Sequence, residues 1–284
     1  MKTQDTIEKP MIKSRKFIIP NFSFRKIKNK DSKKIKVLIT SGGTKIKIDR
    51  VRSISNMSKG TFGSQIASSF VYKRDENINM IFLGAYDSRK PKIDAVHGGK
   101  VDLNDRIEKK DGSIQDLYYL NENNYGKIYG YETFEDYEKS LFELIENEKP
   151  DIIVLSAAVS DYGVENYVDG KIRTSSDDMI IRLKPLPKLI SKVREKAPNA
   201  FIVGFKLLVD STEDELKEAC INSMNNNKLN MIVGNDLRDI QNNDHTLTLG
   251  YWNEDNTQVL FEKYSKSQGK LSDYLVDKIM EKLK

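Results

Sequence analysis

Cysteine and histidine are scarce in this sequence. Its 284 residues include one cysteine, Cys220, and two histidines, His97 and His245. A single cysteine excludes an internal disulfide framework and a metal site built from several cysteines. Two histidines leave little material for a zinc site or a Ser-His-Asp triad, and both stand in polar turn contexts, so we expect them to be solvated. The chemistry of the chain must therefore rest on other residue types.

Long hydrophobic runs are absent as well. No window approaches the ~18 consecutive apolar residues that a membrane helix needs. Hydrophobic residues make up 38% and charged residues 31% of the chain, and the length suits one large α/β domain or two small ones. We therefore expect a soluble, cytoplasmic enzyme with no membrane partner.

Positive charge is concentrated at the N-terminus. Residues 1–36 hold twelve Lys and Arg against three acids, a net charge of +9, whereas the whole chain carries +5, so residues 37–284 come to −4. Such a segment suits contact with RNA or an acidic membrane surface, but a disordered solubilising extension is the more common case. We therefore expect residues 1–34 to be a disordered basic extension without a nucleic-acid partner, and residues 35–284 to form the functional domain.

Short apolar runs alternate with amphipathic helical patterns along the rest of the chain. Strands are expected at 37–41, 78–83, 127–131, 152–155, 179–183, 201–205 and 231–233. Helices are expected at 61–74, 133–148 with Thr133 as the N-cap, 187–196 from Pro187, 212–226 and 269–283. Segments 246–249 and 258–261 alternate as a β-hairpin does, and 100–103 is a weak strand pattern. This order predicts a three-layer, Rossmann-like α/β fold with a mostly parallel sheet and a C-terminal β-hairpin.

Polar or small residues follow four of the predicted strands. These segments are SGGT (41–44), SAAVSDY (156–162), GFK (204–206) and GND (234–236). Parallel strands place their carboxyl ends at one edge of a sheet, and ligands bind beyond that edge. The sequence therefore predicts a site there.

The connection between the first strand and the first helix is unusually long. A connector of about twenty polar residues inside a compact domain is usually functional. Gly60 and Gly63 then open a helix whose first N–H groups lack partners, which suits a phosphate. The alternative is an ordinary surface loop that uses glycines for its turns.

Two common nucleotide-binding fingerprints are missing. Gly42-Gly43 leads into the long connector instead of a G-x-G-x-x-G turn, and the second strand ends without an acid for a ribose. The G-x-x-x-x-G-K-[ST] pattern is absent too. These absences argue against an ordinary dinucleotide site and a Walker-type site.

Five motifs together resemble phosphopantothenate–cysteine ligase in its stand-alone form. They are IDRVRSISNMSKGTFG (48–63), SAAVSDY (156–162), GKIRT (170–174), GFKLLVD (204–210) and IVGND (232–236). The resemblance implies that the carboxylate of 4′-phosphopantothenate attacks the α-phosphate of CTP or ATP, with Mg²⁺, to give an acyl-nucleotidylate and pyrophosphate. The amine of L-cysteine then displaces the nucleotide, a step of coenzyme A biosynthesis. It also implies a homodimer, to which the hairpin at 246–261 would contribute strands.

The resemblance further implies roles for individual residues. Asn56, Arg52 and Lys171 match the catalytic positions: Asn56 would bond the acyl-phosphate region, Arg52 a substrate phosphate or carboxylate, and Lys171 would close over the triphosphate from a mobile flap. Two of them have a structural alternative, since Asn56 can fix its own loop and Arg52 can brace the loop through Asp49. The nucleotide-binding positions are Gly42, Gly43, Ser58, Gly60, Gly63, Ala157, Ala158, Asp161, Lys171, Phe205 and Lys228.

Some of these positions have a second interpretation. Ala157 and Ala158 are also what close packing selects, and Phe205 suits a core as well as a base pocket. Lys228 is displaced relative to the family lysine. Asp161 matches a family residue near the nucleotide sugar or its metal, and the metal ligands themselves are left unassigned. An NAD(P)-binding reductase, or a non-catalytic nucleotide-binding relative, remains the alternative function.

Overall fold

The computed structural model describes residues 34–72, 78–91, 118–119, 126–174, 178–242 and 244–283. The predicted N-terminal extension lies outside the described residues apart from Lys34, as do His97 and the weak strand pattern at 100–103.

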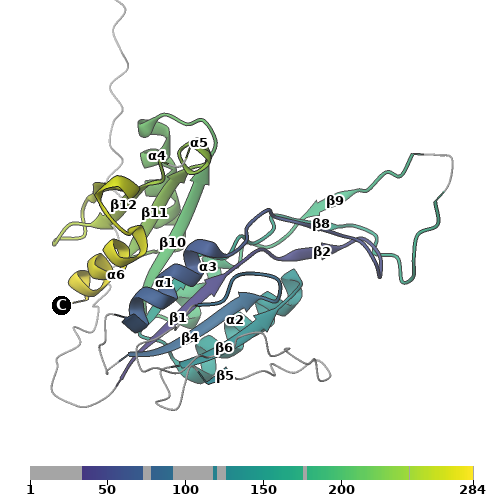
Figure 1. The fold of residues 1–284 in the computed structure, drawn as a ribbon, viewed down its shortest axis with the longest axis horizontal. Helices are drawn as coiled ribbons and strands as arrows, with labels where there is room; N and C mark the ends of the chain where they lie inside the picture. Colours follow the sequence, from purple (N-terminus) through teal and green to yellow (C-terminus); the bar gives the residue numbers. More distant parts are fainter. Residues whose placement is uncertain are drawn as a thin grey trace, which may run out of the picture.

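A nine-stranded sheet forms the centre of the molecule (Figure 1), in the order β13-β12-β11-β10-β7-β1-β4-β6-β5. Its strands are β1 (Ile35–Ser41), β4 (Ile78–Ala85), β5 (Tyr118–Tyr119), β6 (Gly126–Tyr131), β7 (Ile152–Leu155), β10 (Phe201–Leu208), β11 (Met231–Asp236), β12 (Thr246–Trp252) and β13 (Val259–Ser265). The six strands from β11 to β6 pair in parallel. β12 and β13 form the predicted antiparallel hairpin, and β5 is antiparallel to β6.

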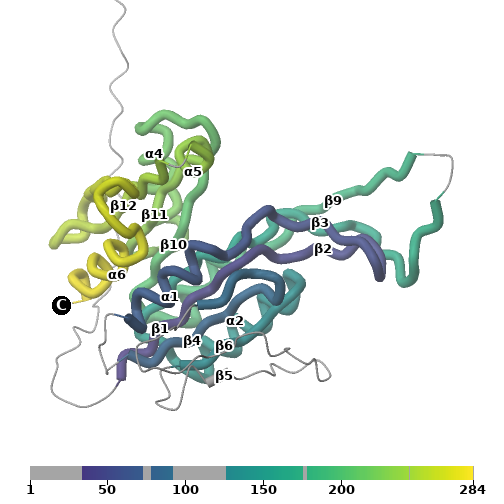
Figure 2. Tube along the Cα trace, viewed as in Figure 1, coloured from purple at the N-terminus to yellow at the C-terminus, as the bar shows by residue number. Residues whose placement is uncertain are grey.

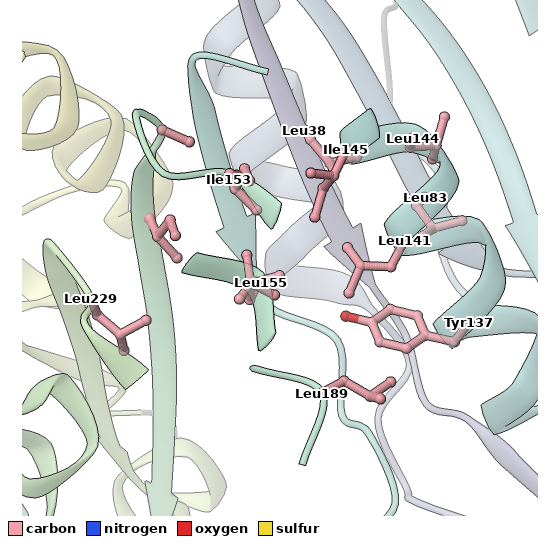
Figure 3. Close-up of a cluster of buried hydrophobic side chains, with 14 of the residues drawn as sticks. Leu38, Leu83, Tyr137, Leu141, Leu144, Ile145, Ile153, Leu155, Leu189 and Leu229 are labelled. Carbon is pink, nitrogen blue, oxygen red and sulfur yellow. The ribbon is translucent and has the colours of Figure 1, made fainter. Parts of the chain in front are cut away.

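Helices cover both faces of this sheet. They are α1 (Thr61–Tyr72), α2 (Phe134–Glu148), α3 (Ile190–Lys196), α4 (Glu213–Asn227), α5 (Leu237–Gln241) and α6 (Leu271–Lys282), with a 3₁₀ turn at Lys266–Gln268. Along β1, Leu38 joins the buried cluster under α2, α3 and α4, whereas Val37 and Ile39 join the cluster under α1 and α6. Figure 3 shows the first of these clusters, with Leu141 and Ile145 of α2 packed toward the strands. The three-layer α/β fold is therefore confirmed.

Two helices begin with a capping box, of which the cap at Thr133 was predicted. The Thr133 side chain accepts a bond from Asp136 N, and the Asp136 side chain accepts one from Thr133 N. Thr212 and Glu215 form the same reciprocal capping box at the start of α4. Each pair satisfies two N–H groups that the helix itself leaves unpaired.

Two short hairpins form an arm that projects from the sheet (Figure 2). They consist of β2 (Lys45–Lys47) with β3 (Ser53–Ser55), and β8 (Tyr162–Val164) with β9 (Leu183–Pro185). We use the term arm for residues 44–56 and 161–186. The long connector after β1 is thus folded, which the sequence did not predict.

Two predicted elements are corrected. The strand expected at 179–183 is instead Leu183–Pro185 in the arm, because Met179 and Ile180 are exposed and pair with no strand among the described residues. The helix expected from Pro187 begins at Ile190, after Leu189 has been buried in the core.

Candidate active site

The carboxyl ends of β1 and β7 are joined beyond the sheet. Ala158 N donates to Gly42 O at 2.8 Å, and Thr44 N donates to Ala158 O at 3.3 Å. The Thr44 hydroxyl accepts a bond from Ser160 N at 2.9 Å. Gly42, Gly43, Ala157 and Ala158 therefore lie together at the edge where the sequence predicts a ligand.

The first turn of α1 packs directly on these strand ends. A Cβ added to Gly63 would lie 2.5 Å from the hydroxyl oxygens of both Ser41 and Ser156, so no larger residue fits. Gly42 and Gly60 have positive φ angles of 90° and 67°, which favour glycine. The N-terminus of α1, whose first N–H groups have no acceptor within the helix, is thereby held at the carboxyl edge of β1.

Asn56 links the arm to this edge. Its exposed side-chain amide donates to Ala158 O at 2.9 Å, and the nearby Ser58 hydroxyl accepts a bond from Gly60 N at 3.4 Å. The loop after β3 is therefore fixed to the end of β7. In this arrangement Asn56 fixes its loop, and its amide lies among the joined strand ends.

An aromatic cluster stands beside the first turn of α1. The ring of Phe62 meets Phe205 of β10 edge-to-face at 6.1 Å between centroids and His245 at 5.5 Å. His245 Nε2 lies 2.8 Å from Asn235 Oδ1, at the end of β11. The expectation that His245 is solvated is therefore wrong: it is half-buried, and burial lowers its pKa below the ordinary 6.5. The sequence did not single out Phe62. Nor did it predict that Phe62, His245 and Asn235 lie together, because they come from segments that are distant in the sequence.

Lys90 is a second residue that the sequence did not single out. It follows β4, its ammonium donates to Ala85 O, and its own carbonyl accepts a bond from the Ser64 hydroxyl of α1 at 2.9 Å. Burial lowers the pKa of Lys90 to about 8. The only signal available was a lysine shortly after a strand end.

The tip of the arm is organised around Asp49. This buried carboxylate accepts bonds from Val51 N and Arg52 N at 2.7 Å and from Ile172 N at 3.1 Å. Burial raises the pKa of Asp49, but these hydrogen bonds outweigh burial, so the net pKa is lowered. Arg52 donates to Ile172 O at 2.7 Å and lies 3.6 Å from Asp49, which is the bracing role expected as its alternative.

The predicted site residues fall into separate groups. Those at the carboxyl edge of the sheet or against it are Gly42, Gly43, Asn56, Ser58, Gly60, Gly63, Ala157, Ala158 and Phe205. Arg52 and the exposed Lys171 lie on the arm, away from the sheet, and Asp161 lies at its base, 4.0 Å from Lys188. Lys228 caps the C-terminus of α4, just before β11 begins, so it lies at the opposite edge.

Among the described residues, no three of His, Cys, Asp and Glu converge in a group that could hold a metal ion. Nor, in the same part of the chain, is there a helix both long and apolar enough to cross a membrane.

Comparison with known proteins identifies a family. The model of the DNA/pantothenate metabolism flavoprotein C-terminal domain matches residues 32–97 and 130–283. The chain is 29% identical, over 214 residues, to the coenzyme A biosynthesis bifunctional protein CoaBC of Thermococcus kodakarensis, covering 75% of this chain and 44% of the relative. It is 29% identical to the Homo sapiens phosphopantothenate–cysteine ligase over 201 residues, covering 61% of this chain and 64% of the relative.

A solved structure shares the fold. A Cab2 variant in complex with phosphopantothenate-cysteine superposes with a TM-score of 0.64 at 24% identity, covering 88% of this chain and 86% of that one. The chain spans about half the length of the first curated relatives that it matches.

Proposed function

The chain belongs to the family of the DNA/pantothenate metabolism flavoprotein C-terminal domain, and from that premise we propose that it is a phosphopantothenate–cysteine ligase of coenzyme A biosynthesis. The observation that carries the proposal is the joined end of β1 and β7, where the Asn56 amide reaches Ala158 O beside the first turn of α1. The Homo sapiens relative named for this activity supports it, as does the Thermococcus kodakarensis relative named for coenzyme A biosynthesis. The reductase alternative has no comparable support, because its fingerprint is absent from the sequence.

In the proposed reaction no protein side chain is a covalent nucleophile. The carboxylate of 4′-phosphopantothenate attacks the α-phosphorus of CTP or ATP, and pyrophosphate leaves. The amine of cysteine then attacks the acyl carbon, forming the amide, while the nucleoside monophosphate leaves. Two of the three protons of the cysteine ammonium pass to solvent, and the third stays on the amide nitrogen. Catalysis of such a sequence comes from positioning and from preorganised donors.

The described residues offer these donors. The unpaired N–H groups of the first turn of α1 suit a phosphate oxygen, and Gly42 and Gly63 leave no side chain in its way. The uncharged Asn56 amide donates to the acyl-phosphate region without repelling the carboxylate. Phe62 and Phe205 present ring edges and faces next to this turn, where a nucleotide base would stack.

Mg²⁺ fits the proposal as a companion of the triphosphate. Mg²⁺ is commonly held by one or two carboxylates together with substrate phosphates, instead of an all-protein cage. Asp161, whose carboxylate is 70% exposed at the base of the arm, is the carboxylate we propose for this role. The metal would neutralise phosphate charge. We further place the reaction in the cytoplasm, where a lone unpaired thiol such as Cys220 is usual.

We also propose a homodimer formed through the arm. Exposed apolar side chains are concentrated there: Val51, Ile54, Tyr162, Tyr167, Val168, Met179, Ile180 and Leu183. Exposed apolar surface of this kind marks an interaction site, and a second copy would cover it with an identical arm. The arm is therefore a better candidate for the dimer contact than the predicted hairpin of β12 and β13. Lys171, next to this contact, would close over the triphosphate.

Pyrophosphate release tests the proposal. Purified protein with Mg²⁺ and either CTP or ATP is assayed with 4′-phosphopantothenate present or omitted, and with cysteine present or omitted. We expect release that requires 4′-phosphopantothenate and becomes multiple-turnover only with cysteine. Absence of release with both nucleotides, from protein that is folded and dimeric, would contradict the proposal.

A further inference from the structure

A large groove lies at the edge of the sheet opposite the candidate active site. Its volume is about 1390 Å³, and it is bounded by the C-termini of α2, α3 and α6, the start of β10 and the end of β12. Small-molecule sites usually measure ~300–1,000 Å³. The groove is therefore larger than most metabolite sites, and a peptide segment fits its volume better.

The surface of the groove combines apolar and acidic side chains. Trp252 is half-buried in it and Leu260 is 41% exposed. Five carboxylates and three lysines line it, which gives a formal charge of −2. Glu146, Glu195 and Glu254 are exposed, and none of the three forms an ion pair with another described residue. A basic segment that carries large apolar side chains would match this surface.

The N-terminal segment of this chain has that composition. Residues 9–28 contain seven Lys and Arg and no acid, and they include Phe17-Ile18-Ile19 and Phe22. The charge of the segment is therefore opposite to that of the groove. Large apolar residues in a basic, acid-free stretch are more than a solubilising extension requires.

The chain also enters the fold beside the groove. β1 begins at Ile35 at this edge, and Lys36 N donates to the Asp151 carboxylate at 2.9 Å, with Asp151 N bonding Lys36 O at 2.9 Å in return. Asp151 itself lines the groove. Phe22 and Lys34 are twelve residue steps apart, a distance of up to about 40 Å when the chain is extended, so Phe17 and Phe22 can reach the groove without strain.

We propose that residues 9–28 of the same chain dock in this groove, with Phe17 and Phe22 against Trp252 and Leu260 and with the basic side chains facing the unpaired glutamates. Aromatic burial contributes most of the affinity, because exposed ion pairs contribute little. Tethering compensates for a weak contact, since a short linker gives an effective concentration of the order of mM. This docking holds the basic segment at the far edge from the candidate active site.

Trp252 reports on the proposal directly, because it is the only tryptophan of the chain. Acrylamide quenching and the emission maximum of Trp252 are compared between the full chain and the F17S/F22S variant, which keeps the length and charge of the segment. We expect stronger quenching and a red-shifted emission in the variant. Ile7→Ser, outside residues 9–28, is the matched control and leaves both unchanged. Denaturation in urea verifies that all three proteins are folded.

A peptide of residues 9–28 gives a second measurement. Added to the F17S/F22S variant, it should restore the quenching of the full chain in a saturable manner, and a scrambled peptide of the same composition should not. Glu195→Lys combined with Glu254→Lys should weaken binding of the peptide a few-fold at low salt, and less at high salt. Quenching that F17S/F22S leaves unchanged, with no response to the peptide, would overturn the proposal. Protection of Trp252 that grows with protein concentration would overturn it too, because the occupant would then be the segment of a second copy.

Discussion

Replacement of Asn56 by alanine separates the two interpretations of this residue. Among the described residues, the exposed Asn56 side chain makes one hydrogen bond, to Ala158 O at 2.9 Å. A single hydrogen bond of this kind contributes ~0.5–1.5 kcal/mol to stability, and exposure places Asn56 at the low end. If Asn56 only fixes its loop, Asn56→Ala therefore changes stability slightly and turnover little.

If the amide instead donates to the acyl-phosphate region, the loss is kinetic. Removal of one preorganised transition-state donor costs ~10²–10³-fold in kcat. We expect that loss in pyrophosphate release by Asn56→Ala, with the midpoint of urea unfolding close to that of the unmodified protein. Asn222→Ala, an exposed asparagine in the middle of α4, is the matched control and should retain full turnover. A folded Asn56→Ala protein with near-normal turnover would refute the assignment.

Three further predictions follow from the structure. Lys171→Ala should lower turnover ~10²–10³-fold while leaving stability unchanged, because the exposed Lys171 ammonium would act only on the bound triphosphate. Lys192→Ala removes an exposed charge on α3 and is the control. Equal rates in both variants would contradict the role of Lys171 in binding the triphosphate. Gly63→Ala should destabilise the protein by ~1–3 kcal/mol in urea unfolding, because its Cβ would lie 2.5 Å from the Ser41 and Ser156 hydroxyls; Gln65→Ala, on the exposed face of the same helix, should not. Burial lowers the folded-state pKa of His245 below 6.5, so the unfolded chain binds the proton more tightly and stability should fall as the pH drops below about 6.5. The change in unfolding free energy between about pH 7.5 and 5.5 should therefore be smaller in His245→Gln than in the unmodified protein. An unchanged pH dependence in that variant would mean that His245 does not contribute.

The sequence predicted the elements whose cause is local. Thr133 followed by an acid three residues later is a capping signal that needs no tertiary information, and the apolar run at 152–155 forms the expected strand. The convergence of four strand ends at one edge was also predictable, because parallel pairing alone requires it.

The arm was not predictable, because distant segments hold it together. Asp49 stabilises the tip by accepting a bond from Ile172 N, and no local pattern relates positions 123 residues apart. Met179 and Ile180 have the apolar character of a core strand, yet they are exposed on the arm, which explains the misplaced strand at 179–183. A motif match predicts that Lys228 lies near β11, the strand that ends in the site. It does not predict which end of β11 Lys228 is close to.

The central claim is that a carboxylate attacks the α-phosphorus of the nucleotide, and the oxygen atoms record that step. 4′-Phosphopantothenate labelled with ¹⁸O in its carboxylate is turned over with cysteine, Mg²⁺ and the preferred nucleotide, and the products are analysed by mass spectrometry. Formation of an acyl-nucleotidylate predicts one ¹⁸O atom in each nucleoside monophosphate released and none in pyrophosphate. Label in inorganic phosphate, or amide product formed without label in the nucleoside monophosphate, would contradict the proposed mechanism.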